Sequence, residues 1–191
     1  MPTDDSHPSP EFDLEIWKSL AAGTILVIGA LVGAFLIVGP EQIWALFGSA
    51  DLGPIAFETV ERRTSPNDAL ACPPDVCNAK SDMTPPEYMV NAHDLRLAFG
   101  KMISSEPRLV AVDSDNAAMT DRYIQRSKLM RFPDTIVVRF FDRPQGRSTI
   151  ALYSRSQLGK GDMGVNRARI EAIRRSSLDD FEFDVGMNFS A

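Results

Sequence analysis

The strongest strand patterns of the chain are two apolar stretches in its second half, IVVRFF at Ile136–Phe141 and TIALY at Thr149–Tyr153. Both are rich in β-branched and aromatic residues, which favour β-strands. Between them, RPQG at Arg143–Gly146 has the residue types of a tight turn. The connection is short enough for a β-hairpin, and strands joined in this way run antiparallel.

Two further strands are predicted upstream, at Leu109–Asp113 and, with a weaker pattern, at Tyr123–Arg126. Polar turn residues separate the strands at residues 114–116 and around residues 131–134. These loops are too short to hold crossover helices. The sheet is therefore expected to be antiparallel, with about four strands.

A helix is predicted before the strands. TPPE at Thr84–Glu87 forms a capping box with proline at the first helical position, so the helix is expected to run from there to about Ser104. Apolar residues recur on one face at three- and four-residue spacing; they are Ala92, Leu95, Phe99, Met102 and Ile103.

A glycine-rich turn and a second helix follow the last strand. Gly159 and Gly164 permit backbone conformations closed to other residues. Asp162 is the expected N-cap of a helix from about Met163 to Ser177. The order helix, four strands, helix predicts an α+β domain with two helices on one face of the sheet.

Two polar residues, Asn166 and Arg169, fall within the apolar arc of this second helix. A buried amide or guanidinium without partners is costly, so both are expected to be paired. Candidate partners are Asp162, the hydroxyls of Ser154 and Ser156, and backbone carbonyls of the turn.

Two interpretations of this corner follow. The first is an anion site at the helix N-terminus that binds a ligand or partner through Arg155, Ser156, Arg167 and Arg169. The second, which we prefer for the turn itself, is a structural network. Its members are Ser154, Gly159, Asp162, Gly164 and Asn166.

Residues 19–39 (SLAAGTILVIGALVGAFLIVG) carry no charge and are long enough to cross a bilayer as one helix. Trp17 and Trp44 flank this stretch, as interfacial tryptophans do, and Pro40 is expected to bend or end the helix. A cleaved signal peptide is the alternative, but the first 18 residues are acidic rather than basic. The mean hydropathy of −0.12 excludes a polytopic membrane protein.

The orientation of this helix is only weakly signalled. Lys18 is the one basic residue close to either end, which places the amino terminus in the cytoplasm. The soluble domain is then periplasmic, with a bacterial inner membrane as the expected location. Gly29 and Gly33 form a GxxxG pattern that favours a helix homodimer, although small residues are common in membrane helices.

Cys72 and Cys77 enclose two prolines in a C-x4-C pattern. In an oxidising compartment they are able to form a disulfide. Free buried thiols and a metal or redox pair remain the alternatives. Zinc would need further ligands, and the chain has two histidines in all, so no metal or cofactor is expected.

Charge is segregated along the chain. Residues 1–18 carry a net −4, residues 41–95 a net −6, residues 96–175 a net +8 and residues 176–191 a net −4. A basic domain beside a membrane attracts anionic headgroups or an anionic ligand. Alternatively, the acidic flanks fold back and neutralise the basic part.

The motifs at the corner resemble the signature of an uncharacterised family, domain of unknown function 1499, with members in bacteria and chloroplasts. The matching residues are Phe132-Pro133-Asp134, Tyr153-Ser154-Arg155-Ser156, Gly159, Asp162, Gly164, Asn166, Arg167 and Arg169, and the Cys72–Cys77 stretch resembles the start of the family. The resemblance covers roughly residues 71–178. It implies an exported or membrane-anchored α+β domain and brings no activity or catalytic residue.

Five segments are therefore expected. They are an acidic tail (1–18), a transmembrane helix (19–39), an interfacial segment and linker (40–70), the α+β domain (71–178) and a second acidic tail (179–191). A short edge strand within that last tail is an alternative.

The expected function is a non-enzymatic envelope module that contacts an anionic lipid, an envelope ligand or a membrane-protein partner, without nucleic acid. The alternatives are a structural subunit of a membrane complex and, less favoured, a hydrolase. His7 and His93 alone do not assemble a Ser-His-Asp set.

Overall fold

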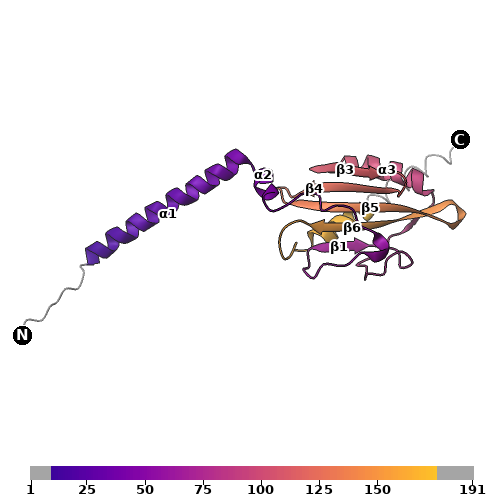
Figure 1. Cartoon of the computed structure of the whole chain (residues 1–191), viewed down its shortest axis with the longest axis horizontal. Helices are drawn as coiled ribbons and strands as arrows, with labels where there is room; N and C mark the ends of the chain where they lie inside the picture. The colour runs from indigo at the N-terminus through magenta and orange to yellow at the C-terminus, as the bar shows by residue number, and fades with distance from the viewer. Residues whose placement is uncertain (1–9, 176–191) are drawn as a thin grey trace, which may run out of the picture. The chain divides into compact units, whose positions relative to one another are not determined.

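The computed structural model describes residues 10–175, which form two compact units (Figure 1). The first unit extends to Ile43, and the second begins at Trp44. The predicted end of the second helix and the C-terminal tail lie partly or wholly outside the described residues.

The first unit consists of helix α1 (Pro10–Val38) and most of the short helix α2 (Pro40–Ala45). The stretch Leu14–Val38 is long and apolar enough to cross a membrane. Helix α1 ends directly before Gly39, whose φ of +88° suits glycine. Pro40 then begins α2, so the predicted break at this proline is confirmed.

The second unit is an α+β domain built on an antiparallel sheet, which confirms the predicted fold class. The sheet has six strands rather than about four. They are β1 (Asp68–Ala71), β2 (Glu87–Tyr88), β3 (Leu109–Asp115), β4 (Thr120–Arg126), β5 (Pro133–Arg143) and β6 (Arg147–Ser156). Their order is β1-β6-β5-β4-β3, and β2 also pairs with β6. The two additional strands, β1 and β2, are too short to show a period in the sequence.

The β5–β6 hairpin forms where it was predicted, and its turn is the short helix η2 (Pro144–Gly146). Because β5 and β6 occupy the centre of the sheet, they are buried on both faces. This position explains why their sequences read as nearly continuous apolar runs.

The predicted start of the first helix at Thr84–Glu87 is wrong. Helix α3 (Ala92–Ser104) begins later and is capped by Asn91, whose side chain accepts a hydrogen bond from the backbone amide three residues on. The earlier segment is extended as β2, because Thr149 donates to the carbonyl of Pro86 and the ring of Tyr88 is buried. Pairing with β6 and burial of Tyr88 outweigh the local capping preference.

Two cores lie on opposite faces of the sheet. On one face, α3 and the helix over residues 165–175 enclose a cluster that includes Leu95, Phe99, Ile136, Leu152, Ile170 and Ile173. On the other face, the cluster comprises Phe57, Leu70, Cys72, Val137, Ala151 and Tyr153. Residues 48–70, which we expected to belong to a linker, thus contribute β1 and the fully buried Phe57 to this domain.

Cys72 and Cys77 are joined in a disulfide, which resolves the alternatives left open by the sequence. The bond closes a short loop at the end of β1, and the Cys72 side chain belongs to the second core.

Replacing both cysteines with alanine is expected to lower the free energy of unfolding by about 2 kcal/mol, because a short loop is no longer closed in the unfolded chain. The measurement is urea unfolding of the full chain in mild detergent. Reduction of the wild type should reproduce the loss, and an unchanged unfolding midpoint in both cases would contradict the prediction.

Candidate functional site at the strand-turn-helix corner

The corner joins the end of β6 to the helix over residues 165–175 through a turn at residues 157–164. Asp162 caps this helix: its carboxylate accepts hydrogen bonds of 2.9 Å from the backbone amides of both Gly164 and Asn166. Gly159 and Gly164 have φ of +91° and +80°, so the turn uses the freedom that only glycine has without strain.

Asn166 is fully buried at the centre of the corner. Its amide nitrogen donates to the Asn67 carbonyl (3.0 Å), the Ser156 hydroxyl (2.9 Å) and the Asp162 carboxylate (2.7 Å). Its amide oxygen accepts from the Ser154 hydroxyl at 2.5 Å. The side chain therefore joins β6, the turn and the segment before β1 in one network.

Arg169 completes this network and is largely buried. Its guanidinium forms an ion pair of 2.6 Å with Asp134, and the two side chains are only 10% and 7% exposed. It also donates to Asn166 (2.7 Å), Ser154 (2.8 Å) and Gln125 (2.5 Å). Both polar residues that the sequence placed on an apolar helix face are thus paired with partners on the sheet.

The predicted anion site is not assembled as expected. Successive residues of a strand point to opposite faces, so Arg155 lies across the sheet from Ser154 and Ser156. There it donates to the carbonyls of Leu52 and Gly53, each at 2.8 Å, and burial lowers the pKa of its guanidinium. Arg155 therefore does not join the hydrogen-bond network of Ser154 and Ser156.

Of the predicted ligand-binding residues, Ser156 is buried within the network and Arg169 is engaged by Asp134. Arg167 is the exposed one, and it pairs with Glu171 one turn along the helix at 3.2 Å. Both of these helix arginines are thus paired with carboxylates of the chain itself, Asp134 and Glu171, which favours the structural interpretation of the corner.

Charges elsewhere in the domain follow the same pattern. Four acidic residues of the segment 41–95 form ion pairs with arginines of the segment 96–175. The pairs are Asp51–Arg122, Glu58–Arg139, Asp75–Arg143 and Glu87–Arg147. The acidic flank thus neutralises part of the basic segment, as one of the two interpretations of the charge pattern predicted.

Asp68 on β1 lies next to the corner and has a perturbed carboxylate. Burial opposes its ionisation, but hydrogen bonds from Arg62 (3.0 Å) and the Tyr153 hydroxyl (2.6 Å) outweigh it and hold the pKa of Asp68 below its usual value. Burial, together with the hydrogen bond to Asp68, raises the pKa of the Tyr153 hydroxyl. The Asp68 carboxylate thus accepts hydrogen bonds from both Arg62 and Tyr153, which is typical of a structural ion pair.

A pocket of about 390 Å³ opens beside the network. Its walls come from three segments: residues 44–47, the loop 127–132 with the start of β5, and the turn and helix over 156–165. Apolar side chains dominate the lining, which consists of Trp44, Phe47, Ser127, Phe132, Asp134, Ser156, Leu158, Gly159, Gly161, Asp162 and Val165. Trp44 fixes one wall, because its Nε1 donates to the Met130 carbonyl (2.5 Å) and its ring lies 4.6 Å from that of Phe132.

Sequence reasoning missed this pocket and several partners of the network, including Asp134 as the partner of Arg169. A lone acid at the start of the apolar β5 was the available signal. Within residues 10–175 there is no group of three or more histidine, cysteine or acidic side chains that could hold a metal ion.

Fold and site together define a small α+β domain with a braced corner and an apolar pocket, preceded by a helix suited to a membrane. The chain belongs to the family described as protein of unknown function (DUF1499), whose model matches residues 63–176. The match includes the whole network from Asn67 to Arg169. No curated protein and no solved structure matches the chain.

Proposed function

We propose that this protein is a single-pass, membrane-anchored binding module of the cell envelope. In this proposal the corner pocket takes the apolar part of an amphiphile that comes from the membrane, such as one acyl chain of a lipid. The role is binding rather than catalysis.

The anchor is helix α1, whose stretch Leu14–Val38 is apolar and long enough to span a bilayer. Lys18 supports an amino terminus in the cytoplasm and a second unit in the periplasm. The disulfide between Cys72 and Cys77 fits this orientation, because such bonds persist in oxidising compartments.

The pocket is the single observation that carries the proposed ligand class. Its volume of about 390 Å³ falls within the range of small-molecule sites, and aromatic and aliphatic side chains form most of its lining. Burying a methylene group in such surroundings contributes about 0.8 kcal/mol, so a chain of several carbons gains useful affinity.

The state of the polar groups supports binding over catalysis. Ser156 and Asp162 line the pocket, but both are held by Asn166, and Asp134 is held by Arg169. A nucleophilic serine needs an adjacent base to activate it. Here the Ser156 hydroxyl accepts a hydrogen bond from the side-chain amide of Asn166, which does not serve as a base.

Filling the pocket is expected to abolish binding without disturbing the fold. Gly161 lines the pocket, and a Cβ at this position meets nothing within 4 Å. Gly161→Phe should therefore weaken binding of dansylated undecanoic acid by about tenfold or more, equivalent to about two methylene groups left unburied. Gly161→Ala adds only a methyl group and is the matched control.

The measurement is energy transfer from Trp44 to the dansyl group in amphipol-solubilised full chain, with Trp17→Phe as background. Saturable binding by wild type and Gly161→Ala, with loss in Gly161→Phe, would support the proposal. Equal titrations for all three proteins would refute it.

A further inference from the structure

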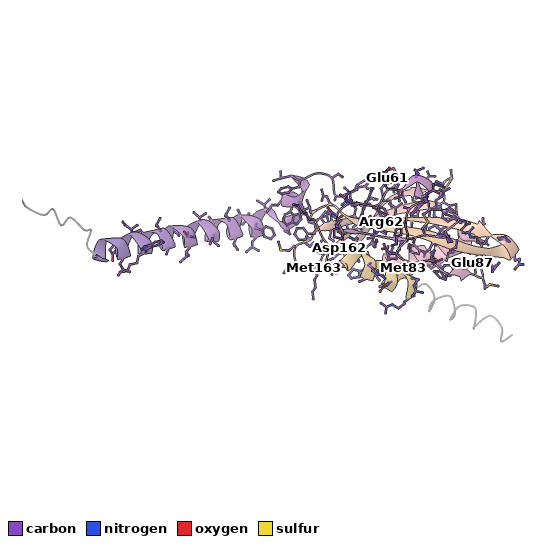
Figure 2. All side chains as sticks on the ribbon, turned by 90° about the horizontal axis from the view of Figure 1, so that it is seen from below. Glu61, Arg62, Met83, Glu87, Asp162 and Met163 are labelled. Atoms are coloured by element: carbon purple, nitrogen blue, oxygen red, sulfur yellow. A yellow bond between two sulfur atoms is a disulfide. The ribbon has the colours of Figure 1, made fainter. Side chains whose placement is uncertain are left out.

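Two loops beside the corner pocket each carry a large apolar side chain that the fold leaves in water. Leu129 in the loop 127–132 is 84% exposed, and Met163 in the turn 157–164 is 104% exposed. Ser127 and Asp162 from the same loops line the pocket, so both tips belong to one end of the domain. Figure 2 shows Asp162 and Met163 at this end, with Glu87 toward the opposite end.

The backbone of both loops is held in an unusual conformation. Met163 has φ of +53° and Arg131, two residues after Leu129, has φ of +58°. Residues other than glycine rarely adopt this left-handed region. The Met163 side chain is fully exposed, so it makes no core contacts that would offset this strain. Strain of this kind is concentrated at sites where a protein binds something.

A lysine accompanies each apolar tip. Lys128 precedes Leu129, and Lys160 lies three residues before Met163; both lysines are exposed. Over the described residues neither ammonium group has a carboxylate within ion-pair distance, although most arginines of the domain do. Apolar side chains next to unpaired cations are typical of segments that lie in the headgroup region of an anionic membrane.

The length of the connecting chain limits how far this end of the domain can move from the end of α1. Trp44 lies six positions after Val38, which is at most about 20 Å of extended chain. Trp44 is in turn bonded to the loop that carries Leu129, through the Met130 carbonyl. With α1 in the membrane as proposed, a connection of this length keeps this surface within reach of the bilayer.

We infer that the loops 127–132 and 157–164 dock on the anionic headgroup layer of the membrane, with Leu129 and Met163 inserted and with Lys128 and Lys160 facing lipid phosphates. This inference rests on the proposed anchoring by α1 and adds a second, peripheral contact with the bilayer. It places the mouth of the pocket next to the lipids from which its ligand comes.

The test places an environment-sensitive fluorophore (NBD) on single cysteines in the full chain, Leu129→Cys and Met163→Cys, in nanodiscs of phosphatidylglycerol and phosphatidylcholine. The native cysteines are bonded to each other and take no label. Met89→Cys is the matched control, because Met89 is also an exposed methionine (76%) and follows β2 directly. Quenching by lipids with a doxyl group near the headgroup reports contact with the bilayer.

Several-fold stronger quenching at positions 129 and 163 than at 89 is expected. Lys128→Glu together with Lys160→Glu should reduce the docked population, because each lysine raises the affinity for an anionic membrane surface about fivefold. Equal quenching at all three positions would overturn the inference.

A label at Val27→Cys in α1 separates the two proposals: if it is quenched while positions 129 and 163 are not, the anchoring stands and the docking falls. Shielding of positions 129 and 163 without lipid quenching would identify a second copy of the chain as the occupant, and would also overturn the inference.

Discussion

Replacing Arg169 with methionine is expected to lower the free energy of unfolding by about 3–5 kcal/mol, because it leaves a buried carboxylate without its cation. Methionine keeps much of the length of the side chain but removes the cation from Asp134, whose carboxylate is 7% exposed and 2.6 Å from the guanidinium. The substitution also removes donors to Ser154 and Asn166. Urea unfolding of the full chain in mild detergent, followed by Trp44 fluorescence in a Trp17→Phe background, measures the loss.

Arg167→Met is the matched control, because it removes the same side chain two residues earlier on the same helix. Arg167 and its partner Glu171 are 60% and 42% exposed, so this change should cost no more than about 0.5 kcal/mol. Combining Arg169→Met with Asp134→Leu should recover part of the stability, since the isolated buried charge is then gone. Equal losses for the two methionine variants would show that the ion pair does not hold the corner.

Replacing Asn166 with leucine is expected to cost about 3 kcal/mol. The two side chains have nearly the same shape, so the loss comes from hydrogen bonds rather than from a cavity. The Ser156 hydroxyl loses its partner in this buried site, and the Ser154 hydroxyl and the Asn67 carbonyl each lose one of two partners, keeping Arg169 and the Ser156 backbone amide. Each buried polar group without a partner costs about 1–3 kcal/mol, and neighbouring groups recover some of these bonds.

Asn78→Leu makes the same chemical change on the surface, where the amide donates a single hydrogen bond of 2.9 Å to the Glu58 carbonyl. It should cost at most about 1 kcal/mol. Because Asn166 and Arg169 contact each other, the double variant should lose less than the sum of the single variants. Strict additivity, or a loss for Asn166→Leu no greater than for Asn78→Leu, would contradict the network described here.

Long, strongly patterned elements of the fold were predictable from sequence, and short ones were not. Strands β5 and β6 are long and apolar because they are central, and a polar turn separates them. In contrast, β2 has two residues and exists because Tyr88 is buried against β6. The capping box at Thr84–Glu87 is a local signal, and tertiary pairing overrode it, so the helix start was misplaced.

The network at the corner was partly predictable, because Asn166 and Arg169 interrupt an apolar helix face and must be paired there. Their nearby partners Asp162, Ser154 and Ser156 were foreseen on this ground. Asp134 was not, since it lies far away in sequence on another strand. The error on Arg155 was avoidable: it follows Ser154 on one strand, and two neighbouring strand residues cannot point to the same face.

The pocket could not be predicted from the sequence, and the reason is physical. Its walls are contributed by three segments separated by tens of residues, and no periodic pattern in the sequence indicates that these segments lie side by side. From the sequence, Trp44 is predicted to be an interfacial residue after a membrane helix. In the structure its ring also packs against Phe132. Only the folded chain shows that aromatic side chains from these segments enclose a common space.

Native mass spectrometry of the full chain, released from mild detergent after purification from membranes, shows whether the pocket holds an amphiphile. We predict that the wild type and Gly161→Ala each retain one amphiphile of membrane origin, and that Gly161→Phe, with its pocket filled, retains none. Wild-type protein that carries no bound amphiphile, or the same occupancy in Gly161→Phe as in the wild type, would contradict the account.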